Sequence, residues 1–250
     1  MERNFNKSLT KIFLLSMFFF ILLLKTTIAE TFTFSLSAKG IKFGSFYMIA
    51  KESGNQYQIT SNFESSGILG AFTKINVSSG VYGRIQNINN NIYYPIEVLS
   101  KWKSLLKQKQ SKIKYKNKKI VHYEVLPYPR KNKYALKINQ LNNTIDPLTV
   151  TYLLLKKRKK INICKGEKLV SEGQTIMKIV FLKKEILQNK ITCDGEFQFL
   201  KGFDPKKYKK KKYKFSVIYK NNNNRNQRLN VTDFIFNTRI GEIIATRLSK

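Results

Sequence analysis

Apolar and polar residues alternate along most of this chain, and residues typical of turns separate the alternating runs. Residues 31–38, for example, place Phe32 and Phe34 on one face, and Lys39-Gly40 then indicates a turn. A period of two is typical of half-buried β-strands, and short connections between such runs are typical of an antiparallel meander. The pattern predicts strands at residues 31–38, 43–51, 56–64, 73–82, 92–101, 112–115, 120–125, 134–138, 175–184, 190–199, 213–219, 234–236 and 242–248.

One segment departs from this period and predicts a helix that begins at Pro147. Asp146 is a favourable N-cap residue, and proline is well tolerated at the first helical position. Apolar residues dominate positions 148–155, and the cations at 156–160 suit the negative end of the helix dipole. Because the apolar side of this segment is broad, we expect the helix to plug or cover a sheet rather than lie on the surface.

These patterns together predict a mainly β fold. We expect a single-domain, antiparallel, strongly curved sheet, like a half-barrel or a spiral, with one main α-helix starting near Pro147. The chain of 250 residues is long enough for one sizeable core. After the N-terminal region, no stretch of the sequence is apolar and long enough to cross a bilayer as a helix.

The N-terminal region has the three parts of a secretory signal peptide. A basic head with Arg3, Lys7 and Lys11 precedes an apolar run at residues 12–24, and Thr27-Ile28-Ala29 forms a small-residue exit. An uncleaved anchor is the alternative, but this thirteen-residue run spans only about 20 Å of helix against about 30 Å of hydrocarbon. We therefore expect residues 1–29 to be a cleaved signal peptide and residues 30–250 to be an exported β-rich domain.

The chain contains two cysteines, Cys164 and Cys193, and both lie in the part expected to be exported. An oxidising compartment lets thiols pair, so these two residues predict a disulfide. Two buried free thiols or half of a metal site are the alternatives. Because a zinc site needs further Cys or His ligands and His122 is the only histidine, we expect no metal site.

The net charge of +32 is extreme, and two explanations compete for it. Removing residues 1–29 takes away four basic residues and one acidic residue, which leaves +29 on the mature chain. Lysines on the wet faces of strands and runs of asparagine favour a compositional bias. A basic surface would nevertheless attract lipid phosphates or other anionic groups. The candidate contacts with an anionic surface are Lys156, Lys157, Arg158, Lys209 and Lys210.

No pattern in the sequence indicates catalysis. His122 and Glu124 would share a face of one strand, where an exposed histidine is the simplest interpretation, and the acidic residues are sparse and scattered. The nucleophile, zinc and phosphate-binding motifs are absent from the sequence. We therefore expect no enzyme activity and no cofactor. Lysine runs with interleaved tyrosines suggest nucleic-acid binding, but export argues against such a partner.

The order of short motifs resembles an uncharacterised family of exported Gram-negative proteins, catalogued as domain of unknown function 3108. The resemblance covers essentially the whole mature chain, and Asp146-Pro147-Leu148-Thr149 with the cysteine pair is its most specific part. It implies a periplasmic location and an antiparallel β architecture similar to the curved half-barrels of lipoprotein carriers, and it supplies no catalytic residues. The heavy lysine content departs from the family. The other motifs that carry the resemblance are Ala38-Lys39-Gly40-Ile41-Lys42-Phe43-Gly44, Ser66-Gly67-Ile68-Leu69-Gly70, Lys201-Gly202-Phe203 and Thr238-Arg239-Ile240-Gly241-Glu242.

From these observations we expect a non-enzymatic periplasmic protein of the cell envelope. Aromatic residues on the concave face of the sheet would hold an acyl chain or an apolar segment of a partner, while the basic rim faces anionic headgroups. The alternative is a protein–protein scaffold for envelope integrity without a ligand cavity, in which the same aromatics are plain core. The candidate ligand-facing residues are Phe32, Phe34, Phe43, Tyr57 and Phe63.

The leader gives the first testable prediction. If the signal peptide is cleaved after Ala29, the protein purified from its native host begins at Glu30 and is released by osmotic shock. N-terminal sequencing and mass spectrometry of the intact chain check this. A chain that still begins at Met1 would contradict the prediction.

Overall fold

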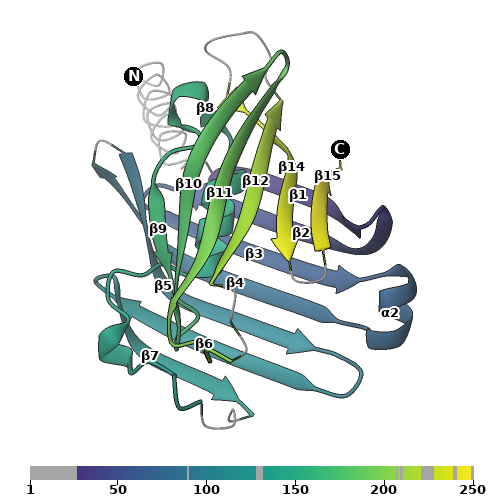
Figure 1. Ribbon diagram of the computed structural model, residues 1–250. Helices are drawn as coiled ribbons and strands as arrows, with labels where there is room; N and C mark the ends of the chain where they lie inside the picture. The colour runs from purple at the N-terminus through teal and green to yellow at the C-terminus, as the bar shows by residue number, and fades with distance from the viewer. Residues whose placement is uncertain are drawn as a thin grey trace, which may run out of the picture.

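Thirteen strands form one antiparallel sheet in the computed structural model (Figure 1). The structure describes residues 27–88, 90–127, 132–206, 208, 211–220, 228–238 and 241–248. The order of strands across the sheet is β7-β6-β5-β4-β3-β2-β1-β15-β14-β12-β11-β10-β9. The strands are β1 (Thr27–Ala38), β2 (Ile41–Ser53), β3 (Gln56–Ser65), β4 (Asn76–Ile88), β5 (Asn90–Lys103), β6 (Gln108–Lys116), β7 (Lys119–Leu126), β9 (Glu167–Val170), β10 (Ile176–Leu187), β11 (Lys190–Lys201), β12 (Lys212–Lys220), β14 (Val231–Thr238) and β15 (Gly241–Arg247).

The remaining described elements are short. Helix α2 (Gly67–Thr73) connects β3 to β4, and helix α3 (Pro147–Leu155) follows the long connection after β7. Two short 3-10 helices lie at Ile138–Gln140 and Lys160–Asn162. Strands β8 (Arg158–Lys159) and β13 (Arg228–Leu229) pair with each other in a second, two-stranded sheet.

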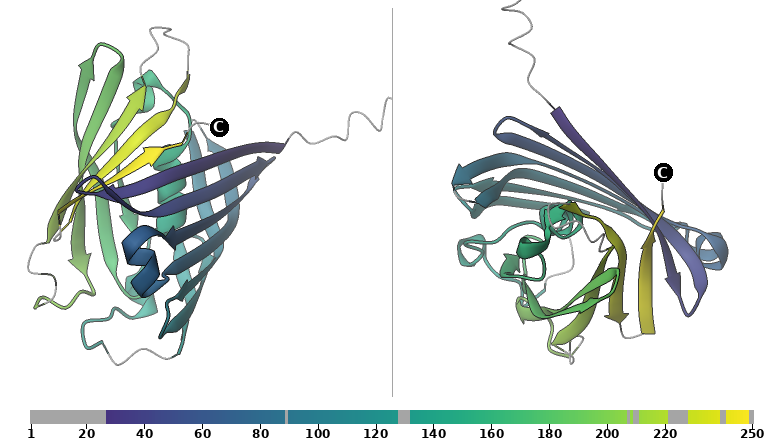
Figure 2. Two further views of the ribbon diagram at one scale, coloured as in Figure 1. Left: turned by 90° about the vertical axis from the view of Figure 1, so that its right-hand side faces the viewer. Right: turned by 90° about the horizontal axis from the view of Figure 1, so that it is seen from above.

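The large sheet has two halves that wrap around α3. Strands β1–β7 form a wide meander, and strands β9–β12, β14 and β15 curl over its concave side, with α3 between the two halves when the molecule is seen from above (Figure 2). The halves meet where β1 pairs with β15, from Phe34 opposite Arg247 to Ala38 opposite Ile243. The predicted strongly curved antiparallel sheet around one main helix is therefore confirmed.

The two edge strands do not pair with each other, so the sheet is not closed. The segment at residues 142–145 bridges to both edges, with Asn142 opposite Lys119 of β7 and Ile145 opposite Val170 of β9. The amide of Ile145 donates to the carbonyl of Leu169 at 2.9 Å. Backbone groups at both edges thus find partners within this connection, which reduces the exposure of the edges to other chains.

Helix α3 forms where the capping residues predicted it. The Asp146 carboxylate accepts a hydrogen bond from the Thr149 amide at 2.8 Å, and Pro147 occupies the first turn. Six of the nine side chains of α3 are buried, which agrees with the prediction that this helix plugs the sheet. The helix continues the same core that the inward faces of the two sheet halves form.

Some expected elements are wrong or displaced. The strand predicted at residues 134–138 is a turn that leads into Ile138–Gln140, because the Asn132 side chain accepts from the Tyr134 amide at 3.0 Å and holds the turn. The strand expected from residue 73 begins at Asn76, because residues 67–73 form α2 and Lys74 then takes a left-handed conformation with φ of 42°. Residues 1–26 of the predicted leader lie outside the described residues, so its cleavage stays a prediction.

The predicted disulfide between Cys164 and Cys193 is confirmed, with the two Cα atoms 4.9 Å apart. Cys193 is fully buried in β11, and Cys164 follows the segment that leaves α3. The bridge thus ties the connection after the helix to the curled half of the sheet.

Replacing Cys193 or Cys164 with serine should lower the free energy of unfolding by about 2–5 kcal/mol, because the open chain gains conformational freedom. Chemical denaturation of the oxidised protein measures the change. Each single variant should lose about as much as the double variant, since either change removes the whole bridge. Two reactive thiols per chain in unreduced, denatured wild type would contradict the disulfide itself.

Candidate functional site

An apolar groove of about 560 Å³ lies between α3 and the concave face of the sheet. Among the residues that the structure describes, twenty line this groove and none of them is charged. This volume is within the range of pockets that hold small ligands. The phenylalanines that line it come from both sheet halves: Phe34, Phe43, Phe46 and Phe63 from the first, and Phe197, Phe234 and Phe236 from the second.

Strand pairing brings these rings together. Phe46 lies opposite both Phe34 of β1 and Phe63 of β3, so one row of rings crosses the first half of the sheet. In the second half, the ring centroids of Phe234 and Phe236 are 4.3 Å apart, and Phe197 stacks on Phe236 at 6.0 Å. The two rows face each other across the groove because the sheet curls around α3.

The groove remains open because small side chains lie among the rings. Ser61 and Ser79 face inward on β3 and β4, where larger residues would fill the space, and Thr151 faces it from α3. A second hollow of about 430 Å³ shares Pro147, Ile179 and further residues with the groove. The apolar lining therefore continues towards β9–β12.

Polar contacts hold α3 at its N-terminal end. The Tyr57 hydroxyl and the Thr149 hydroxyl are 3.0 Å apart, and the Tyr57 ring lies over Gly83, where a Cβ atom would be only 2.4 Å from the ring. A side chain at position 83 would displace the tyrosine. Burial raises the pKa of Asp146, the N-cap residue, above its ordinary value, although the bond from Thr149 opposes that shift.

A cluster around Glu52 holds the other end of the helix. One carboxylate oxygen of Glu52 accepts hydrogen bonds from the Tyr93 hydroxyl at 2.5 Å, the Tyr152 hydroxyl at 2.6 Å and the Lys156 ammonium at 2.8 Å. Burial alone would raise the pKa of Glu52, but these donors hold the pKa below its ordinary value. The ammonium of Lys156 also lies 5.1 Å from the Tyr93 ring centroid. The cluster thus fixes the position of α3 and, with it, the wall of the groove.

The candidate ligand-facing residues divide into two groups. Phe34, Phe43 and Phe63 line the groove. Phe32 and Tyr57 are buried in the core beside it, where Phe32 packs against Tyr152 with ring centroids 6.2 Å apart and Tyr57 bonds to α3. The alternation of apolar and polar residues predicts inward positions for all five, but it does not predict which of them α3 covers.

Sequence reasoning missed the phenylalanines of the second half, Phe197, Phe234 and Phe236. Their alternation along β11 and β14 indicates an inward face. It does not indicate that this face lies opposite Phe34, because that depends on the pairing of β1 with β15.

The candidate cations lie away from the groove. Lys156, Lys157 and Arg158 line another hollow of about 700 Å³ along the C-terminal half of α3, which shares only Leu154 and Ile179 with the groove. Lys156 is bound to Glu52, and Arg158 donates to the carbonyl of Leu153, which caps the helix end. Burial lowers the pKa of Arg158. Lys209 and Lys210 lie outside the described residues.

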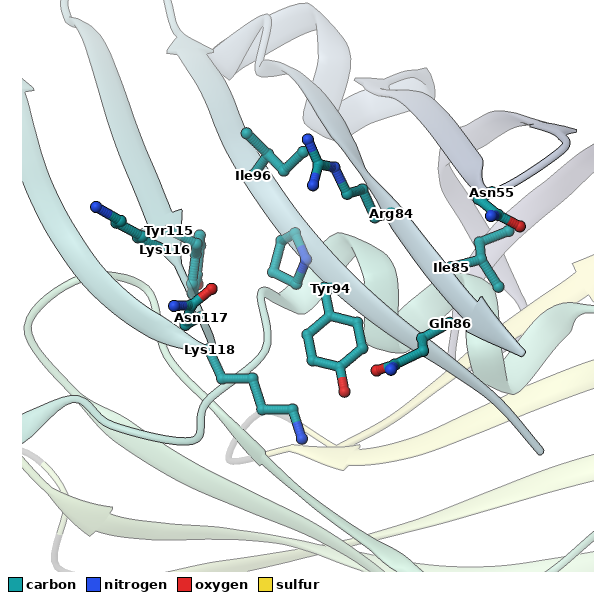
Figure 3. A pocket seen from close by; sticks show the side chains of 11 residues that line it. Asn55, Arg84, Ile85, Gln86, Tyr94, Ile96, Tyr115, Lys116, Asn117 and Lys118 are labelled. Atoms are coloured by element: carbon teal, nitrogen blue, oxygen red, sulfur yellow. The ribbon is translucent and has the colours of Figure 1, made fainter. Parts of the chain in front are cut away.

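A further hollow of about 740 Å³, at the ends of β4, β5 and β6, is more polar. Figure 3 shows that amide and cationic side chains line it, among them Gln86, Asn117 and Lys118. The ammonium of Lys118 lies 4.9 Å from the ring centroid of Tyr94. Charged and amide side chains thus contribute to its lining, unlike the lining of the apolar groove.

The described part of the chain offers neither a metal site nor a membrane-spanning helix. No group of three or more His, Cys, Asp and Glu side chains there is placed to hold a metal ion. None of the helices there is long and apolar enough to span a bilayer.

The cluster at Glu52 generates a prediction about pH. Glu52→Gln should lower the free energy of unfolding by about 1–3 kcal/mol at pH 7, because it leaves the partly buried Lys156 ammonium without its charged partner. Since the folded state lowers the pKa of Glu52, its contribution is present above the ordinary value of 4.5 and is lost as the pH falls through the folded-state pKa. Denaturation at pH 7 and at acidic pH should therefore show a difference between variant and wild type that shrinks on acidification.

Asp146→Asn is the matched control at the other end of α3. Asparagine can still cap the helix, and the raised pKa of Asp146 means that its ionisation costs stability as the pH rises above about 3.8. Relative to wild type, this variant should therefore gain stability as the pH rises from acidic to neutral values, whereas Glu52→Gln should lose stability over the same range. The same sign for both variants would contradict the assigned electrostatics.

No family model matches the chain, and no curated protein matches it. Among solved structures, the chain is similar to a β-barrel-like protein of domain of unknown function DUF1849 from Brucella abortus, at 12% sequence identity. The match covers 90% of this chain and 97% of that chain, with a TM-score of 0.48. A likeness at this level carries no argument about function, and the resemblance to family 3108 stays a prediction.

Proposed function

We propose that this protein is a non-enzymatic protein of the bacterial periplasm that holds an acyl chain or an apolar partner segment in the groove beside α3. The observation that carries the proposal is the composition of the groove. A chain with 47 lysine and arginine residues leaves all twenty lining positions uncharged, and seven of them are phenylalanines.

The physical chemistry of the groove favours an apolar occupant. Each methylene moved from water into such a lining contributes about 0.8 kcal/mol, and aromatic rings supply large contact areas without hydrogen-bonding demands. The lining offers few polar groups, such as the hydroxyls of Ser61, Ser79 and Thr151. It therefore suits an alkyl chain better than a polar metabolite.

The periplasmic location and membership of family 3108 belong to the same proposal. They rest on the predicted leader and on the order of motifs in the sequence. The Cys164–Cys193 bridge is consistent with an oxidising, exported compartment.

Ser61→Phe tests the groove directly. A phenylalanine at this inward position of β3 fills the space between the rings, so the affinity for a fluorescent fatty-acid analogue should fall at least about tenfold, equivalent to about 1.4 kcal/mol. Fluorescence titration of wild type and variant measures the two affinities. Thr60→Phe is the matched control, because it adds the same ring at the exposed position directly before Ser61 in β3. It should leave the affinity unchanged.

Melting temperatures of both variants establish that they are folded. If wild type binds no fatty-acid analogue and carries no lipid in native mass spectrometry, the acyl-chain proposal fails and a scaffold without a ligand becomes the better account. Equal affinities for wild type and Ser61→Phe would place the binding elsewhere.

A further inference from the structure

Four large apolar side chains are exposed at one end of the sheet. Ile68 and Phe72 of α2 are 69% and 76% exposed, and Leu105 and Leu106, in the turn between β5 and β6, are 55% and 91% exposed. We call these four residues the apolar tip. A contiguous exposed apolar patch on a protein surface marks an interaction site more often than a single exposed residue does.

A backbone hydrogen bond holds the two parts of the tip side by side. The amide of Leu105 donates to the carbonyl of Thr73, the last residue of α2, at 3.2 Å. Figure 1 shows α2 projecting from the end of the sheet.

The base of α2 is itself a fixed structure. The Ser66 amide donates to the Phe43 carbonyl at 2.8 Å, and the buried Ser65 bonds to Ile75 through both its amide and its hydroxyl. The chain also packs closely here, since a Cβ atom on Gly70 would lie 2.8 Å from the Ser65 carbonyl oxygen. The apolar side chains are therefore presented outward by a bonded framework.

Exposed lysines outnumber carboxylates at this end of the sheet. The turns and strand ends at this end of β1–β6 include one exposed carboxylate, Glu64, and at least five exposed lysines. Cations near an anionic membrane surface are attracted to the lipid phosphates, and salt screens this attraction. The lysines are Lys39, Lys42, Lys74, Lys103 and Lys107.

We propose that the apolar tip inserts into the headgroup and acyl boundary of an anionic bilayer, where these lysines contact lipid phosphates. Apolar side chains with cations at the same end of the sheet match the two layers of such a surface, and binding of this kind scales with buried apolar area plus electrostatic attraction. A second copy of this chain is a poor occupant, because it would bring the same lysines against each other.

The tip lies beside the groove, since the Phe43 carbonyl accepts the bond from Ser66 while the Phe43 ring lines the groove. Docking goes beyond the proposed function, because insertion of the tip needs no ligand in the groove. The two can fail separately: fatty-acid binding tests the groove and vesicle binding tests the tip.

Trp102 provides a native probe for the test. It is the only tryptophan of the chain and lies in β5, close to Leu105 and Leu106. The experiment measures co-sedimentation of the folded mature protein with phosphatidylglycerol–phosphatidylcholine vesicles at 0.01 M and about 0.5 M salt, where the Debye length is far shorter. Quenching of Trp102 by lipids brominated at shallow acyl positions reports insertion.

The decisive variant is Phe72→Ser with Leu106→Ser, and the matched control is Leu182→Ser with Leu187→Ser on β10, where the two leucines are 60% and 69% exposed. Wild type and control should bind in high salt and show quenching. The tip variant should lose at least about tenfold in high-salt affinity and lose the quenching, with an unchanged melting temperature.

Three results would overturn the proposal. In the first, the wild-type protein binds no vesicles in high salt. In the second, the tip variant and the control variant bind vesicles with the same affinity. The third is a wild type that self-associates in analytical ultracentrifugation while the tip variant does not, because the tip would then be an interface between copies.

Discussion

A helix enclosed by a sheet needs partners for the backbone groups at both of its ends, and the rest of this structure depends on how α3 satisfies that need. Asp146 accepts from Thr149 at the first turn, while the hydroxyl of Tyr219 donates to the Leu154 carbonyl at 3.2 Å at the last. Burial raises the pKa of Tyr219 to about 12, so this donor keeps its proton. The Tyr152 hydroxyl also donates a hydrogen bond to the Glu52 carboxylate, so the helix is held in a single position and the sheet halves curl around it. The groove is the space that this fixed helix does not fill.

Local patterns predicted the local structure well. Alternation located most strands, and the Asp-Pro cap with its apolar run located α3, because both signals depend on near neighbours in the sequence. The turn at Tyr134 and the helix ending at Thr73 were missed, since a side-chain bond from Asn132 and a left-handed Lys74 decide them. The disulfide followed from there being only two cysteines.

The candidate site was predicted in part, for a physical reason. Inward-facing aromatics are evident from a strand pattern, but whether a ring becomes core or groove depends on which neighbours cover it. Phe32 meets Tyr152 and the Arg247 guanidinium, whereas Phe34, two residues on, lines the groove, although both rings are almost fully buried. Charge is segregated in the same way: lysines such as Lys114 occupy exposed strand positions while the groove has none, so the composition of the surface says little about the interior.

The pairing of β1 with β15 has a consequence for the order of folding. Each half of the sheet consists of strands joined by local connections, which can zip soon after they are made. The seam between the halves joins the two ends of the chain, so it closes a loop that contains almost every other element and carries the largest entropic cost. Its formation is therefore expected to be the slow step, as in other proteins rich in distant contacts. Until it forms, β1 and β15 are both unpaired edges, and a chain lacking either strand would expose the phenylalanines of the groove to aggregation.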